Sequence, residues 1–192
     1  AVKPKWALNY LTHDKFSLPQ LEEFIDMKGD SVSVGKYFTE MLDPAMTWDD
    51  VARMVEFWDG QFCLKGVMSV EDARKAAEIG CTGIVVSNHG GRQLDGSRSP
   101  FDQLGEIVDA VGDRLDVIMD SGIQRGTHIL KALSMGAKAV GGGRFYLYAL
   151  AAAGQGGVER ALELMKLEIE RDMRLMGVTR LGDLNRDNLR FR

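Results

Sequence analysis

Residues 83–95 read Gly-Ile-Val-Val-Ser-Asn-His-Gly-Gly-Arg-Gln-Leu-Asp, so a short apolar run is followed at once by a polar loop containing two glycines. An apolar run that does not alternate with polar residues predicts a strand buried on both faces of a sheet. The polar loop then begins where the strand ends. Comparable runs recur before and after this stretch. The pattern of this stretch therefore indicates the fold of the surrounding chain.

Regular units of a short strand, a glycine-containing loop and an amphipathic helix extend in both directions from this stretch. Such alternation predicts parallel βαβ units and hence an α/β fold. Ser69 and Gly80 are typical of the start and the end of the helix between them. The predicted strands cover residues 62–66, 83–87, 115–120 and 139–141, and the other predicted helices cover residues 100–111 and 126–135.

Longer helices are predicted on either side of these units. The first starts at Thr47, which two aspartates follow closely, and ends near Gly60. Its apolar face would contain Val51, Met54, Val55 and Trp58. The last helix is expected to pack outside the sheet through a stripe at helical spacing. That stripe consists of Val158, Ala161, Leu162, Met165, Ile169, Met173 and Met176.

Polar side chains follow every predicted strand, at the edge where (β/α)8 barrel enzymes build their active sites. These barrels commonly bind phosphate after the last two strands. The sequence therefore favours a (β/α)8 TIM barrel, with four βα units and a C-terminal helix over residues 44–192, rather than a doubly wound sheet. Residues 1–43 are predicted to be a variable excursion preceding a barrel helix. The polar segments are Lys65, 87–89, 120–122 and 142–144.

Composition excludes several classes of partner. The chain has 192 residues, a net charge of -4 and a pI near 5.4, so it offers no broad basic surface for nucleic acid. Cys63 and Cys81 lie in no metal-ligand spacing and are predicted to be reduced core residues of a cytoplasmic protein. No apolar run is long enough for a membrane span, and the N-terminus lacks the apolar core of a signal peptide.

The loop after the second predicted strand places an imidazole, His89, near a guanidinium, Arg92. An imidazole can remove a proton near neutral pH, and a guanidinium can bind a carboxylate through two hydrogen bonds. The pair therefore suits deprotonation of a small substrate that carries a carboxylate. On these two residues alone, the alternative is that His89 caps a turn and Arg92 is a solvated surface charge.

Residues 87–95 resemble the active-site signature of the FMN-dependent α-hydroxy acid dehydrogenases and oxidases, a family that includes glycolate oxidase, L-lactate dehydrogenase and mandelate dehydrogenase. Three further motifs agree with that family in order and spacing: Leu64-Lys65-Gly66, the run 120–126, and Gly143-Arg144 before a helix. The resemblance extends from Thr47 to the C-terminus, which corresponds to the C-terminal half of the family's barrel.

The resemblance implies FMN as cofactor and a role for each matching residue. His89 would bind the substrate and act as general base, and Arg92 would clamp the substrate carboxylate. Lys65 would lie beside the flavin ring and stabilise negative charge there. The remaining cofactor contacts would come from Ser87, Asp120, Ser121, Gly122, Ile123, Gln124, Gly143 and Arg144.

The implied reaction is oxidation of a small (S)-2-hydroxy acid, of the lactate, glycolate or mandelate type, to the 2-oxo acid. The resemblance leaves the electron acceptor open between oxygen, a quinone and another carrier. It predicts a cytoplasmic homo-oligomer, or a protein that also contains the N-terminal half of the barrel. Because residues 1–43 resemble a region that helps some bacterial relatives to associate with membranes, peripheral contact with the inner face of a membrane is a further hypothesis.

This sequence departs from the family pattern in three ways. Gln124 stands where the family usually has an arginine, and Gly141 and Gly142 stand where bulkier apolar residues are common. The first four βα units, with the carboxylate that orients the catalytic histidine, have no counterpart. Three interpretations therefore stay open: part of an active FMN enzyme, a half-barrel that binds FMN or phosphate without turnover, and a non-catalytic scaffold. A flavin-dependent isomerase is the nearest alternative chemistry, but it gives no reason for His89 and Arg92.

Overall fold

The computed structural model describes residues 4–13 and 39–191, which fall into two compact units, Ala1–Val51 and Ala52–Arg192. In the first unit, helix α1 (Pro4–Thr12) stacks the rings of Trp6 and Tyr10 with their centroids 5.4 Å apart. Most of the predicted excursion over residues 1–43 lies outside the described residues. The domain boundary at residue 43 therefore stays a prediction.

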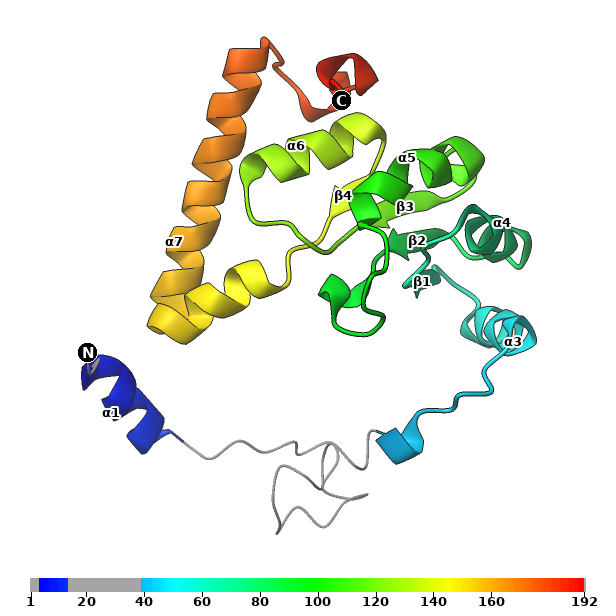
Figure 1. Ribbon diagram of the computed structural model, residues 1–192, viewed down its shortest axis with the longest axis horizontal. Helices are drawn as coiled ribbons and strands as arrows, with labels where there is room; N and C mark the ends of the chain where they lie inside the picture. Colours follow the sequence, from blue (N-terminus) through cyan, green and yellow to red (C-terminus); the bar gives the residue numbers. More distant parts are fainter. Residues whose placement is uncertain (1–3, 14–38, 192) are drawn as a thin grey trace. The chain divides into compact units, whose positions relative to one another are not determined.

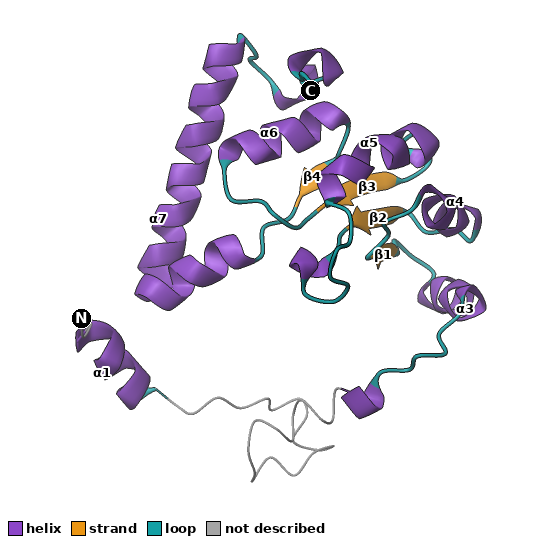
Figure 2. Cartoon of the chain, in the orientation of Figure 1, coloured by secondary structure: helices purple, strands orange, loops and turns teal. Residues whose placement is uncertain are grey.

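The second unit is built on a parallel sheet whose four strands follow chain order (Figures 1 and 2). In the central register, Leu64 pairs with Ile84, and Ile84 pairs with Val117. The strands are β1 (Cys63–Lys65), β2 (Gly83–Val86), β3 (Asp116–Met119) and β4 (Ala139–Val140). All four lie within the predicted ranges.

A helix follows each strand, as the sequence predicts. The Ser69 hydroxyl caps α4 by accepting a hydrogen bond from the Asp72 backbone N–H at 3.0 Å, and Gly136 ends α6 in the left-handed conformation. The helices are α3 (Trp48–Trp58), α4 (Val70–Glu78), α5 (Pro100–Val111), α6 (Gly126–Met135) and α7 (Arg144–Met176). Short 3-10 turns cover His89–Gly91, Leu181–Asp183 and Arg186–Asn188.

The core of the second unit forms where the two central strands meet the helices that cover them. Burial of each large aliphatic side chain there contributes roughly 1.5 to 3 kcal/mol. The largest fully buried side chains are Ile84, Leu104, Ile107, Val86, Val111 and Val117. Because this core holds β2 and β3 rigidly, the loops that leave their carboxyl ends start from fixed positions.

Two predictions about buried residues are only partly correct. Cys81 is buried as predicted, but Cys63 is exposed, because in the described sheet β1 has a strand partner on one side only. In the stripe predicted for the last helix, Met165 is buried and four other residues are half-buried, but Leu162 is 55% exposed. Among the described elements α7 packs mainly against α6, so much of its surface is left uncovered.

The predicted apolar face of α3 is also only partly buried. Val51 is 7% exposed, but Met54 and Trp58 are 43% and 63% exposed. The spacing of apolar residues therefore correctly marks a helical face, but it does not show whether anything within the chain covers that face.

An ion-pair cluster joins the start of α6 to the middle of α7. The Glu168 carboxylate accepts hydrogen bonds from Arg125 Nε at 2.8 Å and from the Gly126 backbone N–H at 2.6 Å. Arg171 Nη2 lies 3.6 Å from the same carboxylate. Hydrogen bonding from Arg125, then from the Gly126 backbone, lowers the pKa of Glu168 to about 2. Because a Cβ on Gly126 would lie 2.9 Å from the Ile169 backbone nitrogen, glycine permits this close approach.

The substitution Glu168→Gln is expected to lower the free energy of unfolding at pH 7 by about 2 kcal/mol, the scale of hydrogen bonds to a charged group. The carboxyl pKa is depressed on folding from 4.5. Its stabilisation is therefore present above pH 4.5 and is lost as the pH falls toward 2. Urea unfolding at pH 7 and at pH 3 should show a difference between parent and variant that shrinks in acid.

The matched control is Glu163→Gln on the same helix, where the side chain is 60% exposed in its pair with Arg160. An exposed pair contributes at most about 1 kcal/mol, so this control should change stability little. Equal losses in the free energy of unfolding for the two variants at pH 7 would contradict the stabilising role of the Glu168 carboxylate.

Candidate functional site

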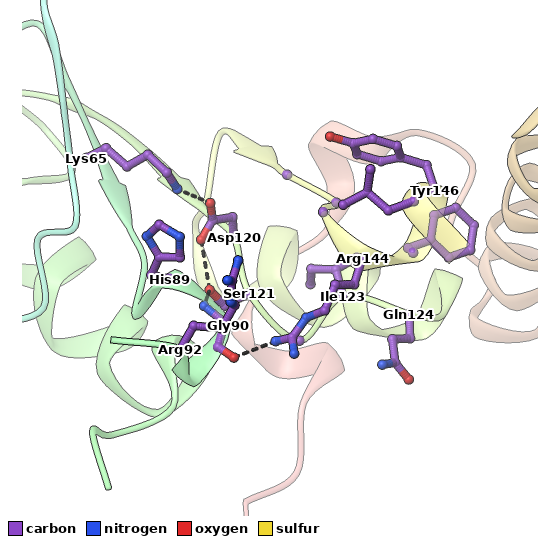
Figure 3. A pocket seen from close by; sticks show the side chains of 16 residues that line it. Lys65, His89, Gly90, Arg92, Asp120, Ser121, Ile123, Gln124, Arg144 and Tyr146 are labelled. Carbon is purple, nitrogen blue, oxygen red and sulfur yellow. Dashed lines mark hydrogen bonds and ion pairs between the residues drawn. The ribbon is translucent and has the colours of Figure 1, made fainter. Parts of the chain in front are cut away.

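A pocket of about 350 Å³ lies at the carboxyl ends of the strands (Figure 3). It brings together side chains from the loops after all four strands, as the sequence predicts. Of the predicted site residues, ten line it: Lys65, His89, Arg92, Asp120, Ser121, Gly122, Ile123, Gln124, Gly143 and Arg144. Ser87 does not line the pocket, but it is buried directly at its edge, where its hydroxyl accepts a hydrogen bond from Lys65 Nζ at 3.1 Å.

Lys65 and Asp120 form an ion pair across the pocket floor, from the ends of β1 and β3. Burial acts to raise the pKa of Asp120, but hydrogen bonds from Lys65, Ser87 and Ser121 outweigh it, so the pKa lies below its ordinary value. The carboxylate therefore stays ionised at neutral pH and holds the lysine ammonium at the carboxyl ends of the strands.

Ser121 links the loop after β3 to the loop that carries His89. Its hydroxyl accepts a hydrogen bond from the Gly90 backbone N–H at 2.9 Å and donates one to Asp120 Oδ1 at 2.9 Å. Ser121 and His89 have φ angles of 74° and 55°, in the left-handed region. Such a conformation costs about 1 to 3 kcal/mol for a residue with a side chain and persists only where its surroundings hold it. The hydrogen bonds of Ser121 supply part of that restraint.

Arg144, the first residue of α7, also holds the loop of His89. Its Nη2 donates a hydrogen bond to the Gly90 carbonyl oxygen at 2.5 Å. Nothing lies within 4 Å of where a Cβ on Gly142 or Gly143 would be, so the chain just before this helix is uncovered on that side. A helix N-terminus beside a guanidinium is suited to a phosphate group. These residues therefore fit the phosphate of a mononucleotide.

His89 and Arg92 lie on the same side of the pocket as Lys65, while Gln124 and Tyr146 lie on the other side (Figure 3). The His89 backbone N–H donates to Ser87 Oγ at 3.2 Å, which orients the start of the loop. Among the described residues, no carboxylate forms an ion pair with Arg92 and no side chain hydrogen-bonds the His89 ring. Both functional groups are thus available to a ligand.

The sequence prediction missed several residues that line the pocket. Phe145, Tyr146 and Leu147 form the first turn of α7, and Tyr146 is 41% exposed. Gly90, Gly141 and Gly142 line it through their backbone. For all of these residues except Gly90, the available signal was their position beside Gly143-Arg144, because a cofactor phosphate at a helix start brings the first turn against the rest of the cofactor.

Comparisons with known proteins agree with this geometry. The FMN-dependent dehydrogenase family matches residues 1–191. The L-lactate dehydrogenase (cytochrome) of Saccharomyces cerevisiae is 44% identical over 165 residues, which cover 83% of this chain and 28% of that protein. The L-lactate dehydrogenase of Pseudomonas aeruginosa is 46% identical over 147 residues, covering 77% of this chain and 39% of that protein.

A solved structure of the monotopic membrane protein (S)-mandelate dehydrogenase superposes with a TM-score of 0.86 at 34% identity, covering 97% of this chain and 49% of that one. The chain therefore belongs to the FMN-dependent dehydrogenase family, whose cofactor is FMN. The predicted fold class, four βα units of a (β/α)8 barrel, is confirmed. The chain spans less than half the length of these three relatives.

Gln124 is the residue of the phosphate-side loop that departs from the family pattern, and it lines the pocket opposite Lys65. In a complete barrel, Gln124→Arg is expected to tighten FMN binding by about 1 to 2 kcal/mol, the scale of a partly exposed charge-assisted hydrogen bond. Quenching of flavin fluorescence gives the dissociation constants. Gln124→Met, similar in length but uncharged, should not tighten binding, and equal constants for parent and Gln124→Arg would refute the prediction.

Proposed function

We propose that this chain is part of an enzyme that oxidises a small (S)-2-hydroxy acid to the 2-oxo acid with FMN. The chain would supply catalytic and cofactor-binding residues at the carboxyl ends of its strands. The observation that carries the proposal is that His89 and Arg92, on one restrained loop, open into the same pocket as the lysine, aspartate and arginine assigned to the cofactor. Relatives named L-lactate dehydrogenase and (S)-mandelate dehydrogenase support the same substrate class.

The residues assigned to the cofactor would contact different parts of FMN. Arg144 and the open backbone at Gly142 and Gly143 would hold the FMN phosphate. Lys65, positioned by Asp120, would place a positive charge beside the flavin ring. When bound, FMN supplies the acceptor for the two electrons that leave the substrate.

His89 and Arg92 would act on the substrate. Arg92 would bind the carboxylate through two hydrogen bonds and fix the orientation of C2. The imidazole of His89 would accept the hydroxyl proton, and the carbonyl would form as C2 loses its hydrogen together with two electrons, for which bound FMN would be the acceptor. The hydrogen bonds from Gly90 to Ser121 and from Arg144 to Gly90 keep the His89 loop in place.

A second candidate function is binding of FMN or phosphate without turnover. It is favoured by the His89 ring, which no side chain among the described residues orients. The predicted cytoplasmic location and the predicted contact with a membrane surface stay predictions, and the monotopic relative supports the latter. No helix in the described part of the chain is long and apolar enough to span a membrane.

The test is anaerobic reduction of bound FMN by (S)-lactate, glycolate and (S)-mandelate in a complete barrel. Bleaching of the flavin absorption by at least one of them is expected. Arg92→Met should lower kcat/KM by about 100- to 10,000-fold, since both hydrogen bonds to the carboxylate are lost and each costs about 1.5 to 3 kcal/mol. If the parent binds FMN but none of the acids bleaches it, the binding function is correct instead. Unchanged kinetics for Arg92→Met would remove Arg92 from the substrate site.

A further inference from the structure

The loop between β2 and α5, residues 87–99, carries both of the side chains assigned to the substrate. Its two ends are fixed, because Val86 is fully buried in the sheet and Pro100, the first residue of α5, is buried as well. Residues 91–96 are exposed and, within the part of the chain that the structure describes, form hydrogen bonds only with other residues of this loop. The position of Arg92 therefore depends on what closes the loop.

Asn88 closes this loop with its side-chain amide. Its Nδ2 donates a hydrogen bond to the Arg98 carbonyl oxygen at 3.2 Å, near the far end of the loop. Its Oδ1 accepts a hydrogen bond from the Gly91 backbone N–H at 3.2 Å and so caps the 3-10 turn His89–Gly91. Arg98 is held in turn to α5, where its Nη2 lies 3.4 Å from Glu106 Oε1. One side chain thus joins the end of β2 to the start of α5.

His89 is restrained by other contacts. Its backbone N–H bonds to Ser87 Oγ, and the residue after it is held by Ser121 at its N–H and by Arg144 at its carbonyl oxygen. These contacts come from the end of β2, the loop after β3 and the start of α7. Loss of the Asn88 amide would leave all three intact, whereas the rest of the loop would lose the bond that returns it to α5. The two functional side chains of the loop are therefore restrained by different residues.

We propose that Asn88 is the positioning residue for Arg92, an inference that rests on the proposed role of Arg92 as the carboxylate clamp. By closing the loop, the Asn88 amide holds Arg92 in the conformation in which it lines the pocket (Figure 3). Without closure this conformation is less populated, and the apparent affinity for a carboxylate falls by the same factor. The bound complex itself is unchanged. Asn88 therefore governs substrate binding rather than the rate of the chemical step.

The first measurement is a titration of oxalate into a complete barrel that contains FMN, followed through the flavin absorption. Oxalate has two carboxylates but no hydrogen on carbon, so it binds without being oxidised. Asn88→Ala is expected to weaken oxalate binding about three- to tenfold, the effect of losing one hydrogen bond between neutral groups. Arg92→Met should weaken it far more, because the clamp itself is then missing.

The second measurement is anaerobic reduction of FMN by (S)-lactate. For Asn88→Ala, kcat/KM should fall by the same factor as the affinity for oxalate, while the reduction rate at saturating lactate should change less than about twofold. In an Arg92→Met background, Asn88→Ala should change kcat/KM less than about twofold, because a residue that acts through Arg92 has nothing left to position. Since kcat/KM is measured below saturation, weak binding is no obstacle.

Two variants separate closure of the loop from capping of the turn. Asn88→Ser keeps a side-chain oxygen that can cap the turn, but it is too short to reach the Arg98 carbonyl. It should therefore weaken oxalate binding as much as Asn88→Ala does. Ser97→Ala is the matched control, because its hydroxyl lies in the same loop and has no hydrogen bond among the described residues. It should bind oxalate like the parent.

Trypsin cleavage after Arg92 measures opening of the loop without any substrate. Because cleavage follows the population of opened conformations, the bond between Arg92 and Gln93 should be cut about three- to tenfold faster in Asn88→Ala than in the parent. Ser97→Ala should be cut at the parent rate. The thermal unfolding midpoint of Asn88→Ala should equal that of the parent, because residues 91–96 bury nothing.

The outcomes separate this inference from the proposed oxidation. If oxalate binding depends on Arg92 but Asn88→Ala binds oxalate as tightly as the parent, the inference is wrong and the proposed function stands. If no 2-hydroxy acid reduces FMN but oxalate binding depends on both residues as expected, the inference holds and the oxidation fails. Equal losses of kcat/KM from Asn88→Ala with and without Arg92 would overturn the inference, and so would full oxalate affinity in Asn88→Ser.

Discussion

In a complete barrel, His89→Gln is expected to slow reduction of FMN by a 2-hydroxy acid by about 100- to 10,000-fold, the contribution of a positioned base. Glutamine can still form hydrogen bonds, but it cannot accept the hydroxyl proton at neutral pH. FMN binding should change little, because the hydrogen bonds that join this loop to the residues proposed to bind FMN use the Gly90 backbone and Ser87 rather than the His89 ring. Anaerobic stopped-flow absorbance measures the reduction rate, and fluorescence measures FMN binding.

His13→Gln is the matched control, since His13 lies at the end of α1 in the other compact unit. It should reduce FMN at the parent rate. Rapid reduction by His89→Gln would exclude His89 as the base. If the FMN affinity of His89→Gln fell by the same factor as its reduction rate, the role of His89 would instead be to maintain the structure of the pocket.

The isolated chain is expected to self-associate and to release FMN during gel filtration. Within the residues that the structure describes, β1 and β4 each pair with one neighbour only, and unpaired edges of apolar strands recruit partners. In a closed barrel the first four strands would cover both edges. The exposed residues Phe57 and Trp58 on α3, and Tyr148 on α7, add apolar surface to the unit. Light scattering at several concentrations measures the association.

Co-expression with a polypeptide that supplies the family's first four βα units should restore a monodisperse protein that retains FMN. The matched comparison is the same chain co-expressed with an unrelated α/β domain, which should restore neither property. A monodisperse monomer of the 192-residue chain that keeps FMN and oxidises a 2-hydroxy acid would refute this expectation.

The strands and helices of the second unit could be predicted closely because each carries its own local signal. The ends of α5 and α6 agree with the sequence, since Pro100 suits the first turn of a helix and Gly136 suits a left-handed end. The pocket could be predicted because parallel strands bring their carboxyl ends to one edge, so residues as distant as Lys65 and Arg144 meet there. The functional roles of these residues came from the family resemblance.

The sequence could not reveal pairings between residues far apart in the chain. Arg125 appears in a phosphate-side motif, yet its guanidinium bonds Glu168, 43 residues later, and so holds α6 to α7. Cys63 has the apolar neighbours of a buried strand, but its exposure depends on whether a neighbouring strand is present. A second pocket, which is lined by Ser134 and Asp172 among others, likewise forms only when α6, α7 and the C-terminal segment come together.

The break in α7 has a consequence for how such a protein can change by mutation. Ala153 and Gly154 depart from helical geometry, and a Cβ on Gly157 would overlap the Ala149 carbonyl oxygen, so glycine is required at this bend. The bend divides α7 into a first segment that lines the proposed FMN pocket and a second that packs on α6 through Glu168. Selection for cofactor handling and selection for thermal stability can therefore act on different residues of one helix, and each property can evolve with little cost to the other.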